Sequence, residues 1–245
     1  MLPQTLGAPA AGPARKTAAS LGFYVAILTA ALTVITFVIA FLTPPLSGPN
    51  CTADTCYEYP YLDIASRFPR DYYWMYPAMV LALLYLALMG CIRYFAPDGR
   101  KPLSLIGVSV AAIAAAIIIV TYFVQVAVIP PSLENGETDG IALLTQFNPH
   151  GLFIALEEIG YLLMGVSFVF VAPAFSGDTR IEQALRWVLF LGFVLGIAAL
   201  VGTTLAYGIR REYRFEVFMI SIDWVVLIVA GILLSVVFRR ASQSG

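Results

Sequence analysis

Charge is scarce in this sequence. Only 12% of the 245 residues are charged, whereas a soluble domain carries about 25%. Hydrophobic residues make up 60% of the chain, and the mean hydropathy is +0.86. The 14 Lys and Arg nearly balance the 15 Asp and Glu, so the basic surface that binds nucleic acid is missing. We therefore expect a protein that lies mostly in lipid, with membrane lipids as neighbours and no nucleic acid as partner.

Histidine is almost absent, and this excludes several classes of enzyme. A single histidine, His150, cannot form a histidine-rich di-iron site. The chain also lacks a Gly-x-Ser-x-Gly elbow, a P-loop, the Cys and His spacing of a zinc site, and an aspartate-rich motif for diphosphates. We therefore expect no metal and no cofactor, and the sequence alone assigns no catalytic residue.

Cysteine is also rare, with three residues in the chain. Cys91 falls in an apolar run, where a small apolar residue buried in the bundle is the simplest interpretation. Cys51 and Cys56 lie close together in a loop without the four ligands of a zinc site. If this loop faces an oxidising compartment, a Cys51–Cys56 disulfide is favoured over two free thiols.

What the sequence has in abundance is long apolar runs. A helix needs about 20 apolar residues to cross the ~30 Å hydrocarbon core. The fold expected is an all-α integral membrane protein, a bundle of six transmembrane helices. Residues 1–20 are expected to form a disordered tail, and residues 240–245 a short C-terminal tail. The six spans are predicted at about 21–43, 73–95, 103–129, 149–175, 184–209 and 215–238.

Loop charge predicts the orientation in the cell membrane. With both termini in the cytoplasm, nine Lys and Arg lie on the inner side and five on the outer side, as the positive-inside rule favours. The turn Arg210–Arg214 opposes this arrangement. The cysteine pair then lies outside, together with an acidic loop of residues 132–147.

Two adjacent carboxylates, Glu157 and Glu158, lie in the fourth predicted span, and Asp223 lies in the sixth. A charged side chain at the centre of a membrane helix costs about 2.5–3.5 kcal/mol on insertion scales. With a rise of 1.5 Å per residue, Glu157 and Asp223 each lie roughly 12 Å from the outer end of their spans. Gln125 lies roughly 6 Å from the outer end of the third span. These depths place the polar groups in the outer half of the membrane.

Helical phase relates these residues to one another. Residues seven apart nearly superimpose, so His150, Glu157 and Tyr161 form one stripe if the helix starts at Pro149 with Asn148 as its N-cap. Glu158 is about 100° away from Glu157 and faces elsewhere. Asp223, at the matching depth, is the expected partner of Glu157. In the fifth span, Gly192 and Gly196 form a GxxxG pattern that permits close helix packing.

Each of these residues also has a purely structural interpretation. Either glutamate can pair with an arginine of the turn 210–214, and Asp223 can accept hydrogen bonds from neighbouring Thr or Tyr residues. Tyr161 can be a packing residue, and His150 an interfacial or capping residue. Intramembrane carboxylates are nevertheless functional-site candidates by default. The candidates for binding a ligand or a proton are Glu157, Glu158, Asp223, His150, Gln125 and Tyr161.

Three classes of function remain open. The first is binding or transport of a small or lipid-like ligand in an outer pocket, with a buried carboxylate as proton carrier. The second is a membrane enzyme, an isomerase or cyclase acting on a lipid or isoprenoid, in which carboxylates serve as acid and base. The third is an accessory subunit whose charges pair with a partner. Homo-oligomerisation is left open. We find no internal repeat of the kind that marks many transporters.

Overall fold

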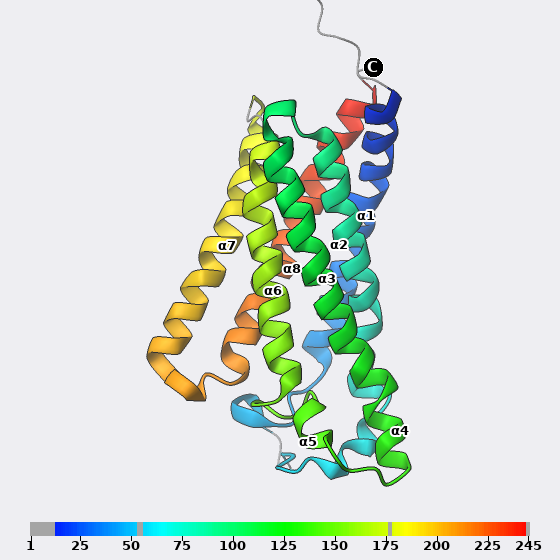
Figure 1. Cartoon of the computed structure of the whole chain (residues 1–245), viewed down its shortest axis with the longest axis vertical. Helices are drawn as coiled ribbons and strands as arrows, with labels where there is room; N and C mark the ends of the chain where they lie inside the picture. Colours follow the sequence, from blue (N-terminus) through cyan, green and yellow to red (C-terminus); the bar gives the residue numbers. More distant parts are fainter. Residues whose placement is uncertain (1–12, 53–55, 176–177, 244–245) are drawn as a thin grey trace, which may run out of the picture.

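The structure is a computed structural model that describes residues 13–52, 56–175 and 178–243. Within these ranges all regular structure is helical. Six helices are long and apolar enough to cross a membrane, as the sequence predicts. They stand side by side in one bundle (Figure 1). Their bounds are Pro13–Leu42 (α1), Met75–Phe95 (α2), Lys101–Ala127 (α3), Leu152–Val171 (α6), Arg180–Tyr207 (α7) and Tyr213–Gln243 (α8).

The ends of the spans differ from the predicted ends in several places. α1 begins at Pro13, so residues 13–20, expected in a disordered tail, are helical, while residues 1–12 lie outside the described residues. α8 continues to Gln243 through most of the expected C-terminal tail. Helices often extend beyond the hydrocarbon core, because water satisfies their terminal backbone groups as well as the helix does.

The fourth span also starts later than predicted. The N-cap of α6 is Gly151 and not Asn148, so Pro149 and His150 precede the helix. The Asn148 side chain instead accepts a hydrogen bond from the His150 backbone N–H (2.9 Å) and donates one to the Ala142 carbonyl (2.6 Å). Asparagine competes for local backbone groups in this way and thereby stabilises a turn in place of a helix start.

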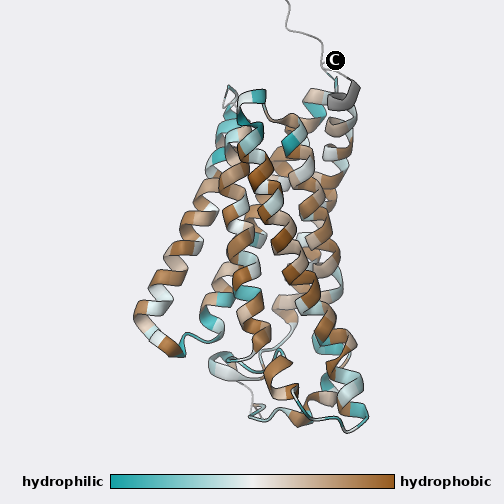
Figure 2. Cartoon of the chain, viewed as in Figure 1, coloured by the Kyte–Doolittle hydropathy of each residue, from teal (hydrophilic) through white to brown (hydrophobic). Residues whose placement is uncertain are grey.

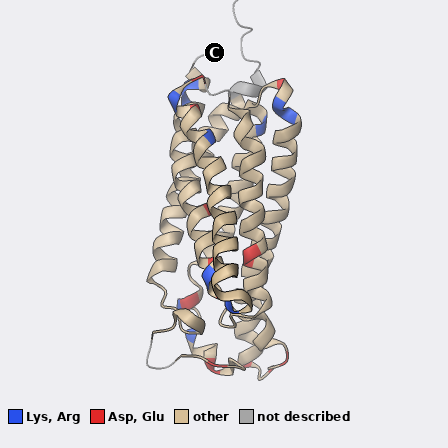
Figure 3. Ribbon diagram, turned by 90° about the vertical axis from the view of Figure 1, so that its left-hand side faces the viewer, with Lys and Arg blue, Asp and Glu red and all other residues tan. Residues whose placement is uncertain are grey.

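The two ends of the bundle are built differently. One end holds both described chain ends and the short turns after α2 and α6. The other, which we call the disulfide end, holds residues 43–52, 56–74, 128–151 and 208–212. Two short helices, α4 (Ile129–Glu134) and α5 (Ile141–Leu144), lie there. Apolar residues fill the helices between the two ends (Figure 2), and charged residues gather mainly at the ends (Figure 3).

The loops of the disulfide end pack against one another and form a cap. The ring of Phe147, just before α6, contacts Tyr57 and Tyr72 of the first loop, with ring centroids 5.7 and 6.5 Å apart. The first loop also carries short 3-10 helices at Gly48–Asn50, Leu62–Arg67 and Arg70–Tyr72. These contacts hold the first and third loops together over the ends of the helices.

Small residues let the helices approach closely. A Cβ added at Gly231 of α8 would lie 2.8 Å from the carbonyl oxygen of Ala26 in α1, so only glycine fits at this contact. Gly192 and Gly196 of α7 face Val226 and Met219 of α8. The GxxxG pattern therefore serves packing inside the bundle, as small residues commonly do in membrane helices.

α7 leaves the bundle toward its C-terminal end, where it leans away from the other helices (Figure 1). Leu205 and Ile209 are 82% and 96% exposed there. The glycine contacts with α8, at Gly192 and Gly196, lie near the middle of α7. The middle of α7 therefore packs against α8, while side chains at its C-terminal end are exposed outside the bundle.

The α1–α8 contact yields a test of this packing. We expect Gly231→Ala to lower the free energy of unfolding by about 1–3 kcal/mol relative to Gly202→Ala, because the new methyl group meets the α1 backbone. Gly202 is a matched control in α7, since a Cβ there would meet nothing within 4 Å. Unfolding by denaturing detergent, followed by circular dichroism, measures the difference. Equal stability of the two variants would contradict the close contact.

Candidate functional site

Glu157 lies on α6, five residues after its first residue Leu152 and thus roughly 7.5 Å into the helix. Its side chain is fully buried, and neither carboxyl oxygen has a hydrogen bond of normal geometry with a described residue. The polar groups that act on it electrostatically are led by the Glu216 carboxyl of α8 and the Tyr122 hydroxyl of α3. Glu157 is therefore a buried acid beside a second acid, with no basic side chain among those groups.

The expected partner of Glu157 was Asp223, and the structure corrects this. Asp223 lies ten residues into α8, roughly 15 Å from its start and deeper than Glu157. Glu216, two turns earlier on the same face of α8, is the acid beside Glu157. The error came from placing the start of α6 at Pro149, which added about one turn to the depth of Glu157.

Asp223 is a second isolated acid. It is fully buried, and neither of its oxygens has a hydrogen-bond partner among the described residues. Oδ1 lies 3.8 Å from the position that a Cβ of Gly165 would occupy, so the missing side chain leaves room for the carboxyl group. Its carboxyl group lies near enough to the hydroxyl groups of Tyr85 and Tyr161 to act on them electrostatically. Asp223 thus lies in the centre of the bundle among α2, α6 and α8.

Tyr161 lies between these acids. Its hydroxyl group is 2.9 Å from that of Tyr122, and the carboxyl groups of both Glu157 and Asp223 are near enough to act on it electrostatically. Farther along α6, the Tyr85 hydroxyl of α2 lies 2.5 Å from the Ser167 hydroxyl. Buried hydroxyl groups in a membrane interior need such partners. A series of polar side chains therefore follows the bundle axis from Glu216 to Ser167.

Glu158 faces away from Glu157, as the helical phase predicts. Its carboxylate forms an ion pair with Arg211, in the turn between α7 and α8. Both side chains are partly exposed, at 12% for Glu158 and 32% for Arg211. This is the structural interpretation that the sequence left open, and it gives Glu158 a role in holding α6 to the turn before α8.

Gln125 and His150 also lie apart from the buried acids. The Gln125 amide donates to the Leu144 carbonyl (2.6 Å) and accepts from the Gln146 backbone N–H (2.8 Å). It therefore fastens the third loop to α3. His150 lies outside α6, contrary to the expected stripe, with 65% of its side chain exposed and Nε2 3.5 Å from Glu212. Its position in the Asn148 turn explains why it misses the Glu157 face.

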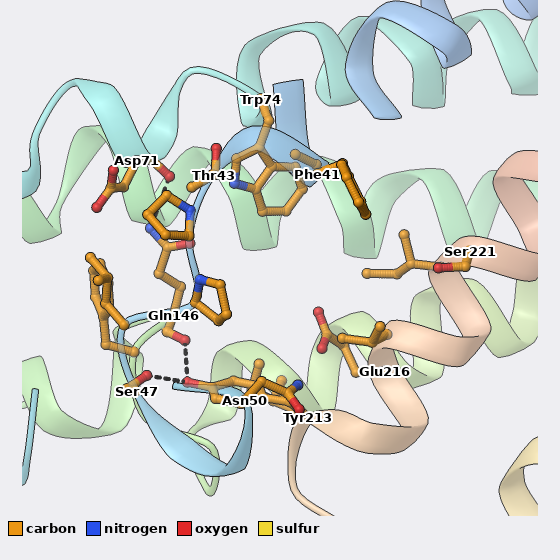
Figure 4. A pocket seen from close by; sticks show the side chains of 18 of the residues that line it. Phe41, Thr43, Ser47, Asn50, Asp71, Trp74, Gln146, Tyr213, Glu216 and Ser221 are labelled. Carbon is orange, nitrogen blue, oxygen red and sulfur yellow. Dashed lines mark hydrogen bonds between the residues drawn. The ribbon is translucent and has the colours of Figure 1, made fainter. Parts of the chain in front are cut away.

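A pocket of about 270 Å³ lies at the disulfide end, between α1, α8, the start of α2 and the loops (Figure 4). Its walls are mainly apolar and aromatic, and Glu216 reaches into it from α8. The lining includes Phe37, Phe41, Trp74, Phe153, Val217, Ile220 and Trp224.

The floor of the pocket is polar. The Tyr213 hydroxyl donates its proton to the Gln146 carbonyl (2.9 Å), so the Ser47 hydroxyl, also 2.9 Å away, must donate to Tyr213 (Figure 4). Asp71 closes the same side and is held by Arg70 through Oδ1 (2.5 Å). The pocket thus has a hydrogen-bonding end and an aromatic end.

The mouth of the pocket lies between the C-terminal end of α1 and the first turns of α8. Phe41 and Val217 line the pocket and are 83% and 48% exposed. Both belong to helices apolar enough to cross a membrane. Farther along, α1 and α8 pack closely at Gly231, so the gap is confined to the disulfide end.

Sequence reasoning missed several residues of this site. Glu216 lies seven residues before Asp223 and therefore on the same face of α8, a pattern visible in the sequence. Because Glu216 lies near the start of the helix, the sequence did not mark it as a buried acid. Tyr122, Trp74 and Trp224 gave no signal, because aromatic residues are common in membrane helices. The structure also joins Cys51 and Cys56 in a disulfide (S–S 2.06 Å), next to loop residues that line the pocket.

No family model, curated protein or solved structure matches this chain. Among residues 13–52, 56–175 and 178–243, no three His, Cys, Asp or Glu side chains are grouped as a metal site requires. The buried acids and the adjoining pocket therefore carry the functional argument.

The same Glu→Gln substitution is expected to have opposite effects on stability at Glu157 and at Glu158. We expect Glu157→Gln to raise the free energy of unfolding by about 1–3 kcal/mol, since it replaces one of two adjacent buried acids, which have no basic partner, by a neutral group of the same shape. We expect Glu158→Gln to lower it by about 1 kcal/mol, since it breaks the pair with Arg211. Equilibrium unfolding in mixed micelles measures both variants. Destabilisation of similar size in both would show that Glu157, like Glu158, has a stabilising partner.

Proposed function

We propose that this protein binds a small amphipathic or lipid-like ligand in the pocket at the disulfide end. The observation that carries the proposal is the pocket itself, which combines aromatic walls with a hydrogen-bonding floor. Ligand sites in proteins typically have this composition, with a few polar groups that orient the ligand. The isolated acids beside the pocket support a binding role further, because a cost in stability is often retained for function.

The ligand enters from the membrane, between α1 and α8. Phe41 and Val217 at the mouth are exposed on membrane-facing helices, so a hydrocarbon chain in the pocket would continue into lipid. The polar head would lie near Glu216 and the Ser47–Tyr213 pair. Toward the other end of the bundle, the fully buried rings of Phe168 and Phe238 fill the interior. This supports binding from one side rather than an open channel.

A membrane enzyme is the second candidate. The adjacency of Glu157 and Glu216 favours it, because one acid can donate a proton while a neighbouring carboxylate accepts one. An isomerase or cyclase acting on a lipid or isoprenoid needs no more than this. Glu158 is excluded from such a role by its ion pair with Arg211.

We also propose that the disulfide end faces the outside of the cell membrane and that both termini are cytoplasmic. The proposal is supported by the excess of Lys and Arg at the other end and by the Cys51–Cys56 disulfide, since disulfides persist in oxidising compartments. The pocket then opens toward the outer leaflet.

Labelling of cysteine in intact cells tests this orientation. We expect a membrane-impermeant maleimide to label the protein only after treatment with a reductant, because Cys51 and Cys56 are then freed on the outer surface. Cys91 is buried, and Cys91→Ser removes it as a source of signal. Labelling that requires permeabilised cells would place the disulfide end inside.

Tryptophan fluorescence tests ligand binding. Trp74 and Trp224 line the pocket, whereas Trp187 is 61% exposed on α7. In a Trp187→Phe protein in phosphatidylcholine nanodiscs, we expect amphiphiles with a brominated dodecyl chain to quench fluorescence saturably. The physical reason is contact between the bromine atoms and the two pocket rings.

A pair of substitutions on α1 provides the control for this measurement. Ala40→Phe fills the pocket and is expected to weaken saturable quenching at least tenfold. Ala31→Phe adds the same ring at an exposed site on the same helix and is expected to leave it unchanged. Quenching that rises linearly with amphiphile in all proteins would reflect partition into lipid and would overturn the proposed site.

A further inference from the structure

We infer that the ligand of this pocket carries a positive charge and that its binding releases a proton shared by Glu157 and Glu216. The inference rests on the proposed ligand site and adds the class of ligand and its control by pH. It makes the site an exchanger of an amphipathic cation for a proton.

The lining of the pocket favours a cation. Its ionisable acids are Glu216 and Asp71, and no Lys, Arg or His is among the lining residues. Asp71 is engaged by Arg70, so Glu216 is the acid available to a ligand. The indole rings of Trp74 and Trp224 add negative ring faces, which attract ammonium groups. A phosphate or carboxylate head would meet acids without a compensating base.

The presence of a second acid, Glu157, explains why a proton is released when the cation binds. Glu157 lies behind Glu216, outside the pocket lining, and the two carboxyl groups act directly on each other. Two carboxylates that share one site cannot both ionise readily, so the pair holds one proton between them. A cation placed beside Glu216 supplies the missing positive charge, and both acids can then ionise.

The exchange is balanced in charge and atoms. One O–H bond of the pair breaks, its proton leaves to water through the mouth of the pocket, and one cation takes its place beside the two carboxylates. No bond forms within the ligand. The reverse step returns a proton to the pair and frees the cation, so a lower pH favours release.

Several helices contribute further titratable or charged residues near Glu157 and Glu216. Among the described residues, those that act electrostatically on Glu157 or Glu216 are Tyr122 of α3, Glu158 and Tyr161 of α6, and Tyr213 of α8. Arg211 is bound to Glu158. His150 is paired with Glu212 at the surface. The four hydroxyl and carboxyl groups leave the pair without a resident counter-ion, which the ligand would supply.

The experiment uses a probe whose own charge does not change with pH. Brominated dodecyltrimethylammonium is titrated into the Trp187→Phe protein in phosphatidylcholine nanodiscs between pH 5.5 and 8.5, with brominated dodecanol and dodecanoate as neutral and anionic probes. We expect the cation to bind at least tenfold more tightly than dodecanol. Its affinity should rise with pH, approaching tenfold per pH unit where one proton leaves for each cation bound.

Variants identify the groups that exchange the proton. Glu157→Gln is expected to reduce the pH dependence to less than twofold per unit at the upper end of the range, between pH 7.5 and 8.5, because no second acid beside Glu216 then has to ionise as well. Glu158→Gln, with the same chemical change one residue away, and His150→Gln should retain the full dependence. Infrared spectra without any ligand give an independent readout in an Asp223→Asn background, which removes the other unpartnered buried acid: the band of a protonated carboxyl group should disappear on adding Glu157→Gln and persist on adding Glu158→Gln.

A different result would contradict each part of the inference. Absence of saturable quenching with all three probes would overturn the proposed ligand site. Equal affinities for dodecanol and dodecyltrimethylammonium would overturn the cation class. Tighter binding of the cation without pH dependence, or an infrared band that is unchanged in Glu157→Gln, would overturn the shared proton while leaving the cation site in place.

Discussion

Lipid offers no hydrogen bonds, so every polar group in the bundle must find its partner within the protein. Most do: Gln125 binds two backbone groups of a loop, Glu158 binds Arg211, and the buried tyrosines pair with hydroxyl groups. Glu157 and Asp223 are the carboxyl groups within the described part of the helices that break this rule on both oxygens. In the proposed function, a cationic ligand beside Glu216 would supply the partner that Glu157 lacks within the protein.

The architecture was predictable because hydrocarbon thickness fixes the length of each span. The six apolar runs and the close packing at Gly192 and Gly196 could both be predicted from composition and spacing. Helix ends were not, because Asn148 forms a local turn where the same residue type commonly caps a helix. That shift of about one turn was enough to pair Glu157 with the wrong acid.

The candidate site was predictable only in part, for a related reason. Sequence marks a costly group such as Glu157, whose burial needs an explanation, but gives no sign of an ordinary residue that gains its role from its neighbours. Trp74 and Tyr213 are of this kind, since an aromatic residue at a membrane interface is common. The pocket arises from loops that meet across nearly 170 positions of chain, as in the Ser47–Tyr213 hydrogen bond (separation 166), and no local pattern records that meeting.

Three threonines of α1, the helix that forms one side of the pocket, affect how freely this helix can shift against α8. Thr29, Thr33 and Thr36 each donate to a carbonyl group of α1 itself, at 2.6–2.8 Å. Their hydroxyl groups therefore make no demand on α8. A helix whose polar groups are satisfied internally can slide or tilt by small amounts without leaving any of them unbonded. In the proposed site, this would let the mouth beside Phe41 adjust its width to hydrocarbon chains of different thickness, while the close contact at Gly231 holds the rest of α1 against α8.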